Sequence, residues 1–482
     1  MLLSRRNLIR SAASVAIAAP ALRLLGACAT ASPTRPQIRQ RTSSLALQPD
    51  PKGQLDLAPG LTYAVLSRAG GKMSDGLIEP SAHDGMAAFP VEGDPTRCLL
   101  VRNHELGVSD QAHADSAFAQ GGSVDAAFVY DRHPAANRPH SGGTTTALVN
   151  IATRRIERTH LSLAGTAVNC AGGPTPWGTW LTCEETDLKA GDRAGKNHGF
   201  VFEVPAAHKG LATPTPLTGL GRFSHEAAAV DPATGVVYLT EDTGDSLFYR
   251  FLPNARGELA KGGRLQTLAL VEQSGADTRN WSQSQGGDPA LRMVQNRSYA
   301  VRWIDMAAPE SPDGDLRLRG RASGAAIFAR GEGMAFALEP QGAAIYFACT
   351  SGGAAQIGQI WRYTPSAHEG TVREAAAPGA LELFVESTGE SEFEKCDNIV
   401  ASPRGELIVC EDGGGDQFVR AVAPDGLIYT LARNADAGKS EFAGACFSPD
   451  GSTLFVNIQR PGLTLAISGD WSGVRREASR MA

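Results

Sequence analysis

A short pattern recurs along this chain: a turn ending in glycine, a strand of alternating apolar residues, and then an acid. The acid falls at the same place in three copies, which run Gly178 to Glu184, Gly235 to Glu241 and Gly405 to Glu411. Two related copies, beginning at Gly342 and Gly451, lack the acid. Alternation of this kind is typical of a half-buried β-strand. A spacing of roughly 45–65 residues between most copies is typical of propeller blades.

A shorter apolar strand with a polar opening precedes the turns. The openings are Arg102-Asn103-His104-Glu105, Asn169-Cys170, His225-Glu226, Glu332-Gly333-Met334, Asp397-Asn398 and Gly444. Counting them predicts an all-β fold, a six-bladed β-propeller with irregular insertions. One insertion is expected from Ser274 to Asp315, because the gap between neighbouring copies is longest there. We expect residues 56–475 to form this single catalytic domain; 54 glycines, 28 prolines and 6% aromatic residues fit many short strands and tight turns.

Equivalent positions in successive blades of a propeller lie on a ring around the central channel. The predicted ring contains Glu184 or Glu185, Glu226, Glu241, Glu332, Asp397 and Glu411. Carboxylates confined in this way either raise their pKa values or bind cations. The pattern by itself therefore predicts a metal-rich acidic channel. The alternative, that some of these acids are solvated turn residues, stays open for each one alone.

The charge balance limits the partners. A net charge of −6 argues against nucleic acid, because a phosphate backbone is bound by a basic face. A small phosphate ester would need a local positive site made by metal ions or arginine. No nucleic acid is therefore expected as a partner.

The N-terminus predicts export. Arg5 and Arg6 precede a small-residue apolar run from Ser11 to Leu22, a pattern typical of a twin-arginine signal. We expect residues 1–30 to be this signal, the twin-arginine machinery to be its partner, and the protein to be periplasmic or extracellular. Cys28 follows a lipoprotein-like box and could carry a membrane tether, although ordinary cleavage after a small residue is equally readable. Residues 31–55 are predicted to be a polar tether.

Cysteine number adds one constraint. Of eight cysteines, Cys28 belongs to the signal and seven remain. An odd number leaves at least one as a free thiol or a metal ligand.

Several segments together resemble the PhoX-type alkaline phosphatases. The most specific runs from Asn169 through Cys170 and Trp180 to Glu185. Shorter ones follow in the same order, at Gly221–Glu226, Arg330–Gly333, Cys396–Ile399 and Phe447–Asn457. The likeness covers the chain from about Asn103 to Trp471.

This resemblance implies a six-bladed propeller that hydrolyses phosphomonoesters with iron and calcium. By position, Cys170 corresponds to an iron ligand, Glu185 and Glu226 to carboxylate ligands, and Asn103 to a ligand near the phosphate. Arg330 corresponds to the residue that holds the phosphate, and Glu332 and Asp397 to calcium ligands. Further ligands are expected among Glu105, Glu184, Glu241 and Glu411. The expected substrate is a small-molecule phosphate ester, and the expected state is a monomer.

Three other functions remain open. A calcium-dependent lactonase or esterase propeller would not require Cys170 and would have little use for Arg330. A non-catalytic propeller would hold structural calcium only. A related site could also prefer phosphodiesters.

Overall fold

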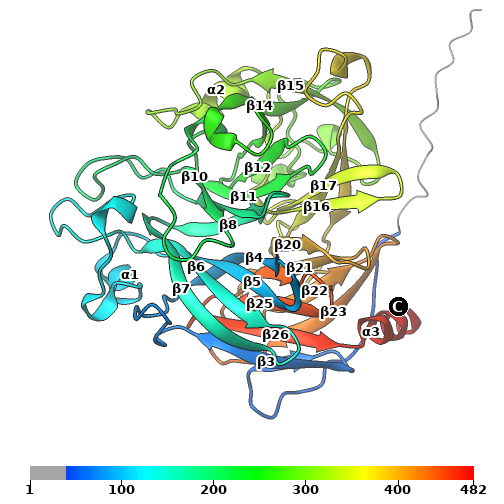
Figure 1. Ribbon diagram of the computed structural model, residues 1–482. Helices are drawn as coiled ribbons and strands as arrows, with labels where there is room; N and C mark the ends of the chain where they lie inside the picture. Colours follow the sequence, from blue (N-terminus) through cyan, green and yellow to red (C-terminus); the bar gives the residue numbers. More distant parts are fainter. Residues whose placement is uncertain (1–38) are drawn as a thin grey trace, which may run out of the picture. The chain divides into compact units, whose positions relative to one another are not determined.

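A computed structural model describes residues 39–482 of the chain. The predicted signal at residues 1–30, Cys28 and the first part of the predicted tether lie outside the described residues. Nearly all of the regular secondary structure in the described part is strand, and the strands are arranged around a centre in the manner of a propeller (Figure 1). The prediction of an all-β, propeller-like fold is confirmed, but the strands form five sheets and not six separate ones.

Four sheets have the form of single blades. The first, in spatial order, contains β4 (His83–Val91), β5 (Asp94–His104), β6 (Gly142–Asn150) and β7 (Arg155–Thr166), and the second contains β8 (Asn169–Pro174), β9 (Thr179–Glu184) and β10 (Val201–Pro205). The third contains β20 (Cys396–Ala401), β21 (Leu407–Glu411), β22 (Phe418–Val422) and β23 (Leu427–Asn434). The fourth contains β24 (Phe442–Phe447), β25 (Thr453–Ile458), β26 (Leu463–Gly469) and β3 (Leu61–Arg68). In the last sheet the N-terminal β3 pairs with the C-terminal β26, so the two ends of the fold are joined by a ladder.

The fifth sheet has nine strands. Its order is β11 (His225–Val230), β12 (Val237–Glu241), β13 (Phe248–Pro253), β14 (Gly263–Leu270), β15 (Ser298–Asp305), β19 (Ala380–Glu386), β18 (Gln359–Thr364), β17 (Gly342–Cys349) and β16 (Gly331–Glu339). The predicted insertion, residues 274–315, contains β15, which pairs with β14 on one side and β19 on the other. The insertion therefore joins two sets of four strands.

The first strand of each set faces the centre. β4, β8, β11, β16, β20 and β24 contact one another in this order, and β24 contacts β4. The apolar core lies between the sets, where faces of neighbouring sheets pack. This packing between neighbouring sheets supports the closed ring of inner strands.

Part of the predicted tether belongs to the fold. β1 (Arg41–Thr42) and β2 (Leu55–Leu57) both pair with β23, and Leu45 and Leu55 are buried in the core. From residue 41 onward the segment is therefore bound to a blade, because its leucines pack into the apolar core. Its polar composition gave no sign of this packing.

Among the described residues, three short α-helices lie in the loops and at the end of the chain: α1 (Asp110–Ala114), α2 (Leu316–Ala322) and α3 (Trp471–Arg480). The Asp470 side chain accepts from the Gly473 amide and caps α3, while Val474 and Ala478 of that helix are buried. Within residues 39–482, no helix combines the length and apolar character needed to cross a membrane.

Candidate metal centre

The inner strands share one feature at their first residues. Each shifts its pairing register within its first five residues, and such a bulge re-aims a side chain. The second residues of the six strands are Asp84, Cys170, Glu226, Glu332, Asp397 and Ala443. Five of the six carry a thiol or a carboxylate, and these side chains are buried.

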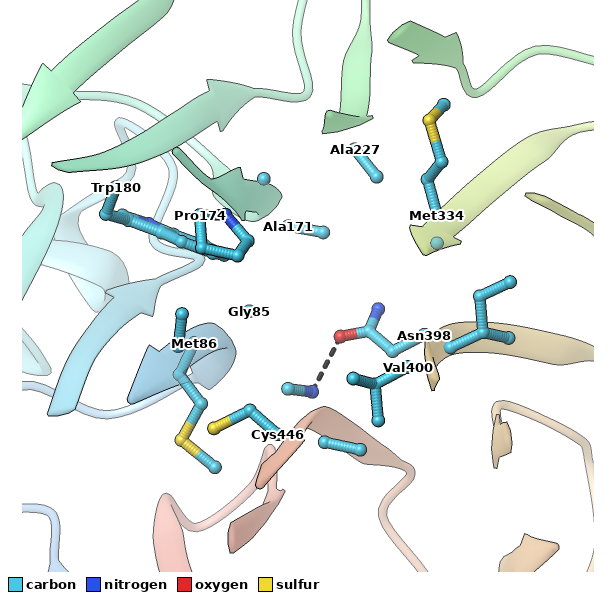
Figure 2. A pocket seen from close by; sticks show the side chains of 16 residues that line it. Gly85, Met86, Ala171, Pro174, Trp180, Ala227, Met334, Asn398, Val400 and Cys446 are labelled. Carbon is cyan, nitrogen blue, oxygen red and sulfur yellow. Dashed lines mark hydrogen bonds between the residues drawn. The ribbon is translucent and has the colours of Figure 1, made fainter. Parts of the chain in front are cut away.

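Small residues beside these ligands let the inner strands approach one another. A Cβ on Gly85 would lie 2.6 Å from the Ala171 Cα, and one on Gly333 would lie 2.6 Å from the Asn398 Cα. The strands enclose a cavity of about 80 Å³, shown in Figure 2. Asn398 there accepts from the Gly444 amide at 2.6 Å, drawn as a dashed line. This cavity is too small for a substrate and marks the channel next to the acidic residues.

Two overlapping groups of potential ligands form the centre. Potential ligand atoms of Cys170, Glu185 and Glu226 lie within 4.8 Å of one another, and so do those of Glu226, Glu332 and Asp397. Glu226 joins the two groups. Both of its carboxylate oxygens are buried without a hydrogen-bond partner among the described residues. A fully desolvated carboxylate with no donor is costly unless a cation binds it.

Glu105 extends the cluster. Its carboxylate accepts from the Gln459 amide at 2.5 Å, and the same amide donates to Asp84 at 3.2 Å. The Cys170 thiol lies 3.7 Å from the Asp84 carboxylate. Asp84 therefore stands between the thiol and Glu105.

The sequence analysis missed four acids that the fold adds. They are Asp84, Asp242, Asp412 and Glu441. The first three are among the charges that raise the pKa of other cluster members, and the pKa of Glu441 is itself raised by burial and then by Asp412, Asp397 and Asp84. Asp84 opens β4 just as Glu226 opens β11, so the strand openings could have identified it. The other three lie in loops, and only the fold brings them near.

The cluster holds far more negative charge than its own donors can balance. Burial, and then the neighbouring carboxylates, raise the pKa values of Asp84, Glu226 and Glu332 well above their usual range. The same causes raise the pKa of Asp397 to about 7, and burial raises that of Glu105 to about 7. Without a cation, these groups keep protons that exposed carboxyls would lose.

Arg330 stands at the edge of the cluster in a left-handed conformation, with φ of 58°. Its Nε and Nη2 atoms donate to the Asp242 carboxylate at 2.8 and 2.7 Å, and Nη2 lies 3.0 Å from Glu332. Arg330 and Glu332 therefore lie side by side at the edge of the cluster. The Arg330 side chain is 39% exposed, so a ligand can reach the guanidinium from solvent.

Three predicted ring members lie elsewhere. Glu184 accepts from His198 and three backbone amides, Glu241 accepts from Leu247 and Tyr249, and Glu411 accepts from Arg420. The structure does not bring them into the cluster. Each is the last residue of its strand, and the acid that follows it is the one that faces the centre: Glu185, Asp242 and Asp412. A shift of one residue exchanges the faces.

The Asn103 side chain is also held by hydrogen bonds within the protein. Its amide nitrogen donates to the backbone carbonyls of Cys170 and Ala171 at 2.9 and 2.7 Å, and its oxygen accepts from the Trp180 indole at 2.8 Å. Both amide hydrogens are thus used, and Asn103 is not among the grouped potential ligands. Its role near the phosphate stays a prediction, and its side chain holds the backbone of the strand that carries Cys170.

The cysteines agree with the prediction of an unpaired thiol. All seven cysteines within residues 39–482 are buried and free of disulfides. Burial, followed by the charge of Asp84, Glu226 and Glu185, raises the pKa of Cys170 well above its usual range. Cys170 is the one cysteine grouped with two carboxylates as a potential ligand set. A thiolate suits a transition metal such as iron, and the remaining oxygens suit calcium, so the donors present fit both ions.

A propeller-like fold with a buried cluster of one thiol and many carboxylates defines a metal-binding propeller protein. A profile of the alkaline phosphatase PhoX family matches residues 42–462. The chain belongs to this family of metal-dependent phosphatases.

One solved structure agrees with this chain in fold. PhoX of Pseudomonas fluorescens, in complex with vanadate, a transition state analogue, is 19% identical with a TM-score of 0.64, over 90% of this chain and 97% of that one. XC5397 of Xanthomonas campestris, a gluconolactonase, is 11% identical with a TM-score of 0.40, over 86% and 98%. The second value is too low to bear on function. No curated protein sequence matches the chain.

Proposed function

We propose that the chain is an exported phosphomonoesterase that uses iron and calcium held by the acidic cluster. One observation carries this proposal: the Glu226 carboxylate, without a donor, joins a thiol-containing group to a carboxylate group beside an exposed arginine. Cys170 would hold iron together with Glu185 and Glu226. Glu226, Glu332 and Asp397 would hold calcium, and Asp84, Glu105, Asp242, Asp412 and Glu441 are further oxygen donors in reach.

We also propose that the propeller has six blades. The nine-stranded sheet is treated as two blades, β11 to β14 and β16 to β19, joined at their outer edges by β15. The ring of six inner strands supports this division. Each blade then contributes its second inner-strand residue to the channel.

The charges explain why cations are required. A phosphate monoester carries about −1.5 to −2 charges at pH 7, and the acidic cluster alone would repel it. When bound, iron and calcium would polarise the phosphoryl group and offset the charge that develops in hydrolysis. The carboxylates would fix those ions, and the backbone held by Asn103 would fix Cys170.

Arg330 would orient the ester. Asp242 holds the Nε–Nη2 edge, so the guanidinium is positioned before a substrate arrives. The rest of the group would donate to phosphate oxygens, where charge-assisted hydrogen bonds are strong and gain strength as charge grows.

Export through the twin-arginine route, a periplasmic or extracellular location and a tether at Cys28 also belong to the proposal. They rest on the N-terminal sequence alone. Fractionation of cells carrying Arg5→Lys/Arg6→Lys would test export, which should fail while the unprocessed protein stays in the cytoplasm.

Hydrolysis of p-nitrophenyl phosphate by the folded, exported protein supplied with calcium at alkaline pH tests the activity. We expect a clear rate, and Arg330→Ala should lower kcat/KM by at least about 100-fold. Arg317→Ala removes another half-buried arginine, paired with Asp245, and should leave the rate unchanged. No rate from protein shown to contain iron and calcium would refute the proposal, and diesters and lactones would then be tested.

A further inference from the structure

A second group of potential ligands lies apart from the acidic cluster. Asp131, His140 and His198 are buried, and their potential ligand atoms lie within 4.8 Å of one another. Asp131 and His140 belong to the segment before β6, while His198 belongs to the segment between β9 and β10. Two long irregular segments therefore meet at these side chains.

The distances suit a small cation. The Asp131 Oδ2 lies 3.2 Å from the His140 Nε2 and 3.1 Å from the His198 Nε2. Ligands at about 2.0–2.1 Å from a tetrahedral ion lie about 3.3 Å from one another. The two distances from Asp131 therefore match those between neighbouring ligands of such a coordination shell, and all three atoms lie within 4.8 Å of one another.

His140 lacks the partner that a buried histidine normally has. Its ring is 2% exposed, yet Nε2 has no hydrogen-bond partner among the described residues, since the short approach to Asp131 has unfavourable angles. A buried polar atom left unpaired destabilises the folded state. A metal ion in reach of the Nε2 lone pair would remove that cost.

His198 has the arrangement typical of a metal ligand. Its Nδ1 lies 2.6 Å from the Glu184 carboxylate, which also accepts from the amides of Ala167, Gly199 and Phe200. In metal sites the second imidazole nitrogen usually donates to a carboxylate, which orients the ring toward the ion. The His198 Nε2 forms a hydrogen bond with the Asp131 carboxylate at 3.1 Å, and a metal ion would replace the shared proton. Glu184, displaced from the predicted ring, thus has a defined position here.

We propose that Asp131, His140 and His198 bind a single transition-metal ion, zinc by donor type, which ties the segment before β6 to the segment before β10. Two imidazoles and a carboxylate are donors that zinc prefers. Three protein ligands leave the fourth position to water. Burial excludes substrate, so the ion has a structural role. It would act through Glu184, the neighbour of Glu185 in the acidic cluster.

Metal content of the exported, full-length protein tests this site independently of phosphatase activity. We expect about one zinc per chain, measured by mass spectrometry of the metals. His140→Gln should lose that zinc while keeping iron and calcium. The matched control is His160→Gln, which changes another histidine with an unpartnered Nε2, on β7, and should keep the zinc.

X-ray absorption at the zinc edge decides the case even where His140→Gln does not fold. The wild-type spectrum should show only nitrogen and oxygen in the first shell, with imidazole scattering. A sulfur neighbour at about 2.3 Å would assign zinc to Cys170 and overturn the proposal. Wild-type protein that holds no zinc after dialysis against excess zinc would overturn it too.

Discussion

At the scale of single residues, Glu226 and Glu411 illustrate two roles of a buried carboxylate, as a metal ligand and as a partner in an ion pair. Glu226 has no donor for either oxygen, whereas Glu411 receives the Arg420 guanidinium at 2.8 Å. Both are almost wholly buried. A buried paired charge maintains the fold, while a buried unpaired one is tolerated only for a ligand.

Glu226→Gln should therefore raise the melting temperature of the metal-free protein at pH 8. The native carboxyl there must either hold a proton that the unfolded chain releases or ionise without a partner, and both are costly. The same change should abolish phosphatase activity and reduce bound metal. Glu411→Gln should have the opposite effect on stability, a loss of about 1–3 kcal/mol, because Arg420 loses its charged partner. Calorimetry and metal analysis of both variants measure this. A lower melting temperature for metal-free Glu226→Gln would contradict the assignment.

At the scale of elements, the bulged start of each inner strand is the device that builds the site. The bulge turns the second residue toward the channel, and the small residue after it allows the neighbouring strand to approach. Gly333 is the clearest case. Its added Cβ would lie 2.6 Å from the Asn398 Cα and from the Asp397 carbonyl oxygen, both on the adjacent strand β20.

Gly333→Ala should lower the free energy of unfolding by about 1–3 kcal/mol, because the backbones of two inner strands must separate. Metal binding by Asp397 should weaken as well. Gly389→Ala is the matched control, since its Cβ would meet nothing within 4 Å, and it should be close to neutral. Urea unfolding compares the two. Equal stability of both variants would show that the strands are not packed as closely as described.

At the scale of the whole molecule, the acidic cluster couples stability to pH and to cations. The pKa values of Asp397 and Glu105 are raised to about 7 in the folded state. Unfolded carboxyls titrate near pH 4, so the folded, metal-free protein holds more protons than the unfolded chain between about pH 4 and 7. These two groups therefore make stability fall as pH rises through that window. Buried neutral histidines such as His83 and His225, whose pKa values burial lowers, make it rise below about pH 6.5.

Relative to Asp397→Asn, the free energy of unfolding of the metal-free protein should drop by at least about 1.4 kcal/mol from pH 5 to pH 8, the value of one pKa unit. The comparison cancels the contribution of the histidines, which both proteins share. Calcium should reverse the loss, and more strongly at pH 8, because it binds the ionised carboxylates. Denaturant titrations at several pH values check this; a pH profile parallel to that of Asp397→Asn in the absence of metal would be inconsistent with the cluster.

The sequence by itself determined the strand content, the propeller-like repeat and much of the centre. Cys170, Glu226, Glu332 and Asp397 all open inner strands, and that local pattern is readable because alternation places a strand's side chains on fixed faces. The family signature between Asn169 and Glu185 indicated a metal-dependent phosphatase. These features depend on neighbours in the chain.

Only the tertiary structure decided which acid at each strand end faces the channel. Glu184 and Glu185 are equally plausible in the sequence, because a one-residue shift exchanges the two faces and a bulge causes such a shift without a sequence signal. Asp242, Asp412 and Glu441 reach the cluster from loops, and the buried Leu45 and Leu55 pack against a blade from the far end of the chain. Such contacts depend on closure of the ring, which no local pattern encodes.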